Sequence, residues 1–210
     1  MMKNTFLLIL LVCLTHTTLK AQDLTYGVML GANFKNIEVE GDGLNAGAAY
    51  SDFKYTAFPV DMGGYIDYGF DEAFGIKANL FYGRTVHEYS SDPGSLSIHL
   101  MAGQVTLQPM LKYDVNKEYG KGFYLLAGPR ASFVISSKFE DSDLGDADGF
   151  YKGSNFGAGI GFGFTFSKTI GFEMMGDYGL SNLLDSSDWK TETAGASVNL
   201  YVNLESLLNK

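Results

Sequence analysis

Most of the chain alternates between apolar residues and small or polar residues with a period of two. The clearest stretch runs from Asn155 to Phe166, where Phe, Ala and Ile occupy the even positions and mainly glycines the odd ones. A helix would scatter these apolar side chains around its 3.6-residue turns, whereas a strand collects them on one face. The stretch therefore predicts a β-strand with one apolar face.

The same alternation recurs in seven further segments, so eight strands are expected in all. They cover residues 24–36, 56–70, 73–86, 96–114, 122–137, 155–166, 169–181 and 192–205. In the fourth segment the apolar positions change parity between Leu100 and Val105, which predicts a β-bulge near Gly103 and Gln104.

Long connections alternate with short ones along the chain. About 19 residues rich in Gly, Asn and Asp follow the first strand, and the acidic stretch 138–152 follows the fifth. Asp71-Glu72 and Ser167-Lys168, in contrast, form tight turns. Long loops on one side and short turns on the other are typical of outer-membrane barrels, and an even number of strands places both chain ends on the short-turn side.

The direction of the apolar face distinguishes a membrane barrel from a soluble barrel of the lipocalin kind. A soluble barrel would crowd about a dozen aromatic rings into a lumen that eight strands make barely wide enough for ordinary side chains. The outward aromatics also gather at the two strand ends, for example Phe34 and Tyr178 near the long loops and Tyr68 and Phe172 near the short turns. Such girdles are typical of membrane interfaces. We therefore predict an all-β fold: a single eight-stranded antiparallel up-and-down transmembrane β-barrel.

The N-terminal segment predicts export. The apolar run Phe6–Leu14 is too short to span a membrane but suits a signal peptide, and Ala21 provides a small residue before a cleavage site. We expect residues 1–21 to be removed and residues 22–210 to form one barrel domain. A lipoprotein acylated at Cys13 is the alternative, although a bulky residue precedes that cysteine. After removal no cysteine remains, which excludes disulfides and cysteine-based metal sites.

Charge narrows the expected partners. Without Lys3 and Lys20 the chain has 13 basic and 24 acidic residues, a net charge of −11. Nucleic-acid binding, which calls for a basic surface, is not expected, nor is adsorption onto an anionic membrane. The expected partners are bacterial outer-membrane lipid and a protein at the long loops. No cofactor is expected.

Several segments resemble the PorT-like family of small outer-membrane barrels of Gram-negative bacteria. These segments are residues 62–70, 74–77, 108–113, 124–129 and 177–182. The resemblance covers the mature chain and implies an eight-stranded, porin-family outer-membrane barrel. The founding member is linked to type IX secretion, which implies a role in the envelope or in secretion. The chain departs from many such barrels by lacking a terminal aromatic residue, with Leu204 as a candidate substitute.

Polar side chains occupy the inward positions of the predicted strands. The expected lumen network consists of Asp61, Lys77, Lys112, Arg130, Glu173 and Asp177, with Asp67, Asn79, Gln108, Asp114 and Asn199 on the same face. Because an isolated buried charge costs several kcal/mol, these charges must pair, and Lys77, Lys112 and Arg130 are expected to face Glu173 and Asp177. They form either a salt-bridged plug or the lining of a selective pore, and the narrow lumen of eight strands favours the plug.

Two other groups of residues could carry chemistry. Weak metal candidates are Asp141, Asp143, Asp146 and Asp148, which lack the spacing and the terminal Glu of a calcium loop and therefore suggest a solvated loop instead.

His87 and His99, with Ser97 close by, lie near the long-loop ends and could serve a lipid hydrolase. No triad spacing can be shown, so we predict no catalytic residue. The expected function is a structural or interaction scaffold that acts through its long extracellular loops. A narrow channel and a lipid-modifying hydrolase are the alternatives.

Overall fold

The computed structural model describes residues 24–40, 45–51, 61–90, 98–139, 147, 149–186 and 188–208, with 45–51 and 90 described by their backbone alone. The expected signal peptide lies outside these ranges. The strands are β1 (Leu24–Glu40), β2 (Asn45–Ser51), β3 (Asp61–Gly69), β4 (Phe74–Ser90), β5 (Ile98–Asp114), β6 (Gly122–Phe139), β7 (Ser154–Thr165), β8 (Ile170–Gly179) and β9 (Lys190–Asn203), followed by the short helix α2 (Glu205–Leu208). No helix in the described ranges has the length and apolar character to cross a membrane.

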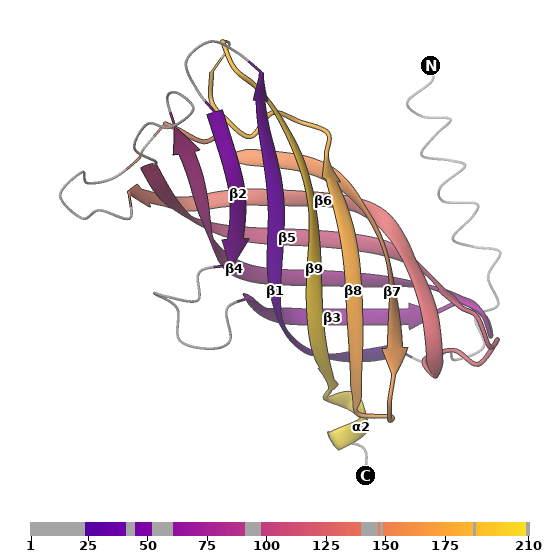
Figure 1. Cartoon of the computed structure of the whole chain (residues 1–210). Helices are drawn as coiled ribbons and strands as arrows, with labels where there is room; N and C mark the ends of the chain where they lie inside the picture. Colours follow the sequence, from indigo (N-terminus) through magenta and orange to yellow (C-terminus); the bar gives the residue numbers. More distant parts are fainter. Residues whose placement is uncertain are drawn as a thin grey trace, which may run out of the picture.

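The strands form one antiparallel sheet that closes into a ring (Figure 1). Closure comes from β1, which pairs with β9 from Gly27 to Glu40. β2 and β3 share one position in this ring, because both pair with β1 on one side and β4 on the other. The described chain therefore forms eight columns around the ring, which confirms the predicted eight-stranded antiparallel barrel.

Most strand boundaries agree with the sequence pattern, but the prediction of a long irregular loop after the first strand was wrong. β1 continues to Glu40, and β2 lies inside the connection that was expected to be irregular. β3 begins only at Asp61, and residues 52–60 lie outside the described chain. The start of β1 and the end of β9 both lie on the short-turn side as expected, since the Leu204 N–H donates to the Tyr26 carbonyl at 2.9 Å.

The short turn between β3 and β4 is fixed by Asp71. Its carboxylate accepts hydrogen bonds from the backbone N–H groups of Ala73 at 2.7 Å and Phe74 at 2.8 Å. These bonds favour the charged form and hold the pKa of Asp71 below its usual value. The tight turn predicted from Asp71-Glu72 is thus stabilised by its own first side chain.

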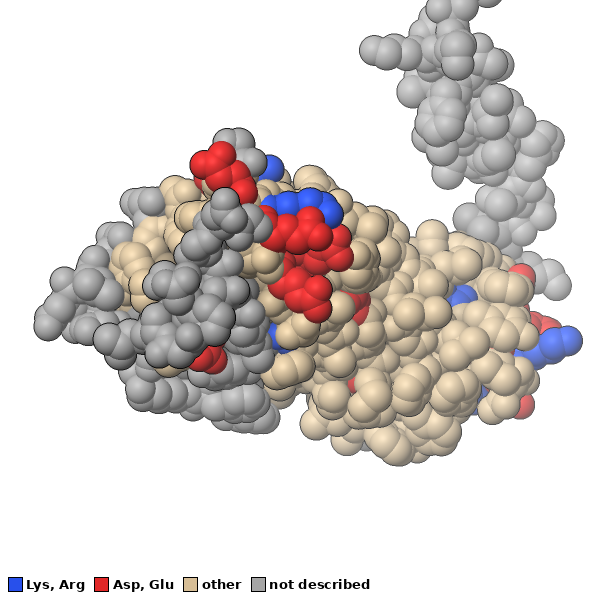
Figure 2. All heavy atoms as spheres, turned by 45° about the horizontal axis from the view of Figure 1, so that its top comes forward, with Lys and Arg blue, Asp and Glu red and all other residues tan. Residues whose placement is uncertain are grey.

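An apolar band surrounds the outside of the ring. Ile160 on β7 is 70% exposed and represents a set of outward Phe, Leu, Ile, Val and Met side chains that occurs on β1 and on β3 to β9. Figure 2 shows an uncharged stretch of this surface between charged groups at the two ends. Such a band can be stable only against lipid, because a water-soluble protein rarely exposes a continuous apolar surface of this extent.

The apolar side chains change sides near the long-loop end. On β1, Phe34 points outward, whereas Ile37 is buried in the lumen and the outward positions become Glu38 and Glu40. The wall therefore extends beyond the bilayer at this end. There its outer face meets water and its inner face forms an ordinary apolar core.

The predicted bulge lies at the expected level but in the neighbouring strand. The register shifts between Gly103, which pairs with Ser136, and Gln104, which pairs with Val134, so Ile135 of β6 is the extra residue. β5 itself alternates without interruption, and the prediction that Leu100 points outward is wrong, because it is 1% exposed. The parity change in the sequence arises because apolar side chains face lipid within the bilayer but face the lumen at the long-loop end.

The ladder between β5 and β6 has a gap in the middle of the apolar band. Leu107 pairs with Ala131 and Leu111 with Ala127, which places Pro109 directly opposite Pro129. Proline has no N–H, so neither residue can donate a hydrogen bond to the other. The unpaired stretch from 108 to 110 follows from this pair of facing prolines.

We expect Ile160→Arg to destabilise the barrel in lipid by about 2–4 kcal/mol, as a cation near the bilayer midplane does. Ile135→Arg is the matched control, because Ile135 is 62% exposed but lies at the long-loop end of the band, where the cost falls to about 0–1 kcal/mol. Urea unfolding in vesicles measures both. Equal costs for the two variants would contradict this placement of the membrane.

Candidate functional site

The lumen holds the six charged residues predicted from the sequence. Asp61, Lys77, Lys112, Arg130 and Glu173 are buried, and the Asp177 side chain is 12% exposed. The other predicted inward residues, Asp67, Asn79, Gln108, Asp114 and Asn199, are buried as well. They are distributed in layers along the barrel axis.

The layer nearest the short turns contains Lys112. Its ammonium group lies 2.8 Å from Asp67 and 3.4 Å from Asp114. Tyr119, from the turn between β5 and β6, contacts this ion pair. Its hydroxyl donates to Asp67, and its ring centre is 4.3 Å from the Lys112 nitrogen. A Cβ atom at Gly75 would come within 2.1 Å of the Tyr119 hydroxyl, so a glycine makes room for the ring. This layer closes the short-turn end.

The next layer is built around a buried ion pair between Lys77 and Glu173. Tyr124 donates a hydrogen bond to Glu173 at 2.8 Å. The ring centres of Tyr65 and Tyr201 lie 4.3 and 4.2 Å from the Lys77 nitrogen, within cation–π range. The ammonium group is thus surrounded by one carboxylate and several ring faces, which replace the water it has lost.

Glycines on the wall make this aromatic layer possible. A Cβ atom at Gly163 would lie 2.2 Å from the Tyr124 ring, and one at Gly171 would lie 1.9 Å from the Tyr201 ring. These glycines occupy the inward positions of β7 and β8, opposite the outward phenylalanines. The glycine–phenylalanine alternation in the sequence therefore combines a lipid-facing surface with space for rings inside the lumen.

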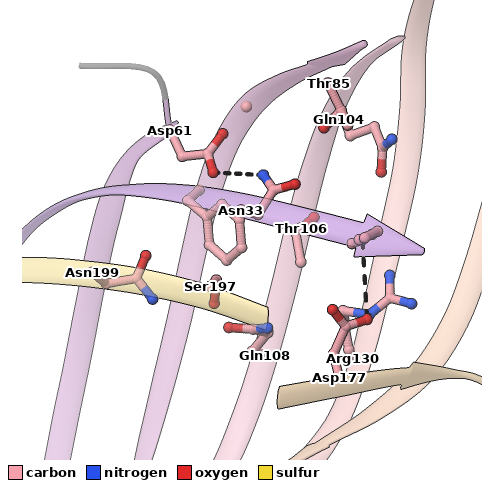
Figure 3. A pocket seen from close by; sticks show the side chains of 13 residues that line it. Asn33, Asp61, Thr85, Gln104, Thr106, Gln108, Arg130, Asp177, Ser197 and Asn199 are labelled. Atoms are coloured by element: carbon pink, nitrogen blue, oxygen red, sulfur yellow. Dashed lines mark hydrogen bonds and ion pairs between the residues drawn. The ribbon is translucent and has the colours of Figure 1, made fainter. Parts of the chain in front are cut away.

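A small polar chamber lies in the middle of the lumen (Figure 3). Arg130 contacts Asp177 at 3.1 Å, and Lys35 lies 4.0 Å from the same carboxylate. On the other side Asn33 donates to Asp61 at 2.7 Å. The chamber has a volume of about 30 Å³, enough for about two water molecules. Its polar lining and small size suit bound water better than an organic ligand.

An apolar cluster closes the mouth at the long-loop end. Ile37, Tyr89 and Leu100 come from the wall, and Tyr151, Leu183 and Leu184 come from the connections β6–β7 and β8–β9. This set, with Ala102 and Ala147, is called the mouth core below.

The two connections are joined to each other through their backbones. Tyr151 and Leu184 form an antiparallel bridge, the Lys152 N–H donates to the Leu183 carbonyl at 3.0 Å, and the Asp185 N–H donates to the Phe150 carbonyl at 3.1 Å. Ordered loop segments therefore cover the end of the lumen, and their apolar side chains are packed within it.

The two histidines considered as catalytic candidates do not meet. His87 is buried against Tyr89 and Tyr151, and in the described chain neither of its ring nitrogens has a hydrogen-bond partner. His99 pairs with Glu88 in the β4–β5 register, so strand alternation places it on the opposite face of the wall from His87. Ser97 lies outside the described residues. The histidines therefore form no common site.

No group of three or more His, Cys, Asp or Glu side chains that could bind a metal ion occurs in the ranges that the structure describes. The metal candidates Asp141, Asp143, Asp146 and Asp148 lie outside those ranges.

Sequence reasoning missed the aromatic part of the lumen and one set of ion-pair partners. Tyr65, Tyr124 and Tyr201 occupy inward positions of their strands, so the alternation could have identified them. Lys112 was expected to face Glu173 and Asp177 but pairs instead with Asp67 and Asp114. The choice among several inward carboxylates depends on strand register, which alternation does not specify.

Comparisons with known proteins agree with this architecture. The model of the family described as outer membrane protein beta-barrel domain matches residues 20–185. Neisserial surface protein A is similar in structure, with a TM-score of 0.50 and 12% identity over 87% of this chain and 99% of that chain. OprG from Pseudomonas aeruginosa has a TM-score of 0.45 and 12% identity, over 85% of this chain and 93% of that chain.

The Yersinia pestis attachment invasion locus protein Ail, crystallised with the heparin analogue sucrose octasulfate, has a TM-score of 0.42 and 14% identity, over 85% of this chain and 98% of that chain. No curated protein matches the chain. The likeness to Neisserial surface protein A bears on the fold alone.

We expect Lys77→Met to destabilise the barrel by about 3–5 kcal/mol, because it leaves Glu173 buried without its cation. The double variant Lys77→Met/Glu173→Leu should lose much less, since it removes both charges and keeps the volume. Urea unfolding in vesicles, followed by heat-modifiable gel mobility, gives both values. A double variant that is less stable than the single variant would contradict the pairing argument.

Proposed function

We propose a function for a protein that belongs to the outer membrane protein beta-barrel domain family and lies in the bacterial outer membrane. It acts as a non-conducting scaffold that holds ordered loops at the extracellular end for recognition of another molecule. The observation that carries this proposal is the filling of the lumen from one end to the other by the Tyr119 layer, the Lys77–Glu173 layer and the mouth core.

A conducting pore would need a continuous aqueous path, and each layer opposes one. Ion pairs fix the lower two layers, and removing either partner of such a pair leaves an uncompensated buried charge. The mouth core consists of apolar side chains that pack on one another, and these side chains would have to move apart and be exposed to admit water. The chamber between these obstructions has room for only about two water molecules. These features favour a plug over the alternative of a narrow channel.

The loop end supplies the features of a recognition surface. Binding residues commonly gather on loops that a rigid scaffold positions, and here the backbone bridge between Tyr151 and Leu184 fixes two loops relative to each other. Acidic side chains at this end include Asp185 and also Glu40 and Glu192, which share the single Lys190 ammonium group at 3.4 and 3.0 Å and so leave an excess of negative charge; Figure 2 shows acidic groups gathered there. A cationic partner surface is the chemistry that this charge would attract.

The proposal does not include catalysis. A Ser–His hydrolase would need a base and a nucleophile within hydrogen-bond reach. His87 packs against Tyr89 and Tyr151 of the mouth core, and His99 lies on the opposite face of the wall, so the two histidines cannot act together. The arrangement favours an interaction role over lipid hydrolysis.

The resemblance to the PorT-like family extends the proposal to a biological setting. We infer that the recognition surface serves envelope integrity or protein secretion, as the founding member's link to type IX secretion implies. The support is the set of resembling segments on β3, β4, β5, β6 and β8. A strain that lacks the protein should therefore be tested for secretion and for sensitivity to detergents.

Purified protein in a planar bilayer should show little or no ion conductance, because three layers obstruct its lumen. A porin inserted under the same conditions provides the positive control, and gel mobility confirms that the protein has folded. Steady and reproducible channels from the folded protein would contradict the plug and favour a pore.

Reversing charge at the loop end should abolish function without unfolding the barrel. Asp185→Lys changes an exposed side chain beside the mouth core, and Glu118→Lys is the matched control at the short-turn end. Complementation of the deletion strain in an envelope-integrity or secretion assay is the measurement, with gel mobility as the folding check. Full activity of Asp185→Lys, or equal loss in both variants, would count against recognition at the loop end.

A further inference from the structure

The lipid-facing wall contains an apolar groove across β1, β3, β4 and β5. It has a volume of about 550 Å³ and is lined by outward side chains of Tyr26, Ile66, Leu80 and Leu107 around a floor that includes Gly64 and Ala78. No charged residue contributes to its lining. The volume lies within the range of small-molecule sites in proteins.

The groove exists because two small residues are neighbours on the outer face. Gly64 lies opposite Leu80, and Ala78 lies opposite Ile66, so the small positions are diagonal across the β3–β4 pair. A Cβ atom at Gly64 would have the Gly27 carbonyl oxygen, at 3.3 Å, as its one neighbour within 4 Å. Neighbouring side chains therefore do not fill the space above the floor.

The register shows that this groove begins next to the short-turn girdle and extends to the middle of the apolar band. Tyr26 pairs with Ile66 and Ile66 with Ala78, one outward position away from the row formed by Leu24, Tyr68 and Ile76. That row is at the aromatic girdle on the short-turn side, which is the periplasmic side of an outer-membrane barrel. An acyl chain of the periplasmic leaflet can therefore enter the groove at its short-turn end and follow it toward the middle of the membrane.

We propose that this groove is a binding site for one acyl chain of a glycerophospholipid from the periplasmic leaflet. The groove is continuous with the apolar band that already contacts lipid, and a flexible hydrocarbon chain can follow a narrow uncharged depression. A second copy of the barrel is the competing occupant. A stable protein interface buries about 800 Å² on each partner, a much broader contact than a groove lined by eight residues.

The energetics determine what kind of binding to expect. Moving an acyl chain from the bilayer to the groove removes no apolar surface from water, so hydrophobic transfer contributes little. The gain comes from dispersion contacts on three sides of the chain, which a convex wall cannot provide. The bound chain should exchange with bulk lipid but occupy the groove more often than any other part of the wall.

A phospholipid that carries a photoactivatable diazirine on one acyl chain tests this site. The protein is reconstituted in vesicles containing a small fraction of this lipid and irradiated, and the labelled residues are mapped by peptide mass spectrometry. We expect labels to concentrate on Tyr26, Ile66 and Leu80. Even labelling of outward residues around the barrel, or cross-links between two protein copies at the groove, would overturn the proposal.

Two variants sharpen the test. Ala78→Phe fills the groove floor and should reduce labelling at Tyr26 and Leu80 to the level of the rest of the wall. Ala158→Phe adds the same ring to an exposed outward position of β7 and should leave the labelling unchanged. If Ala78→Phe keeps the concentrated labelling, the site is wrong. If that variant fails to fold, the distribution of labels on the unsubstituted protein decides.

Discussion

The architecture depends on how charges are accommodated inside a ring too narrow to hold bulk water. Lys77 shows the constraint most clearly: its ammonium group is buried, and it persists because Glu173 supplies the opposite charge and Tyr65 and Tyr201 supply ring faces. Lys112 repeats the solution with two carboxylates and Tyr119. Each cation thereby fixes side chains from several strands in one place. The same contacts that satisfy the buried charges also fill the lumen. The interactions that obstruct the lumen are therefore the ones that stabilise the barrel.

A second constraint acts from outside, because the solvent changes along the wall. Within the bilayer the outer face must be apolar, and the inner face is left for polar groups. Beyond the bilayer water surrounds the wall, and Ile37 and Leu100 point into the lumen while Glu38 and Glu40 point out. The protein is thus a membrane barrel in which the part of the wall beyond the bilayer, at the long-loop end, has an apolar interior and a polar exterior like a soluble protein. The mouth core is a consequence of this change, and it gives the loops an apolar surface on which to pack.

The sequence predicted what alternation and solvent can determine. The eight columns, the outward band and the inward charges follow from a period of two, which is a local property of each strand. β2 escaped prediction because its small residues, such as Ala46, Ala48 and Ala49, lack a contrast between the two faces. The partners of Lys112 escaped because they depend on register between strands. The role of Tyr119 was not predicted, because nothing in a turn sequence indicates that its ring contacts charged groups inside the lumen.

The facing prolines of β5 and β6 indicate where the wall itself is weakest. Apart from the bulge at Ile135, the β5–β6 ladder is continuous on both sides of this gap, but Pro109 and Pro129 cannot donate a backbone hydrogen bond to each other's carbonyl. In hydrocarbon such a loss costs more than in water, since no solvent replaces the missing bond. The barrel tolerates it because the ladders on either side are continuous: Pro109 is held against Ala78 and Pro129 against Ala158. Inside, Met110 and Arg130 are buried next to the gap and anchored by packing and by the ion pair with Asp177. The filled lumen therefore supports the wall where its hydrogen bonds cannot, which an open pore of the same sequence would be unable to do.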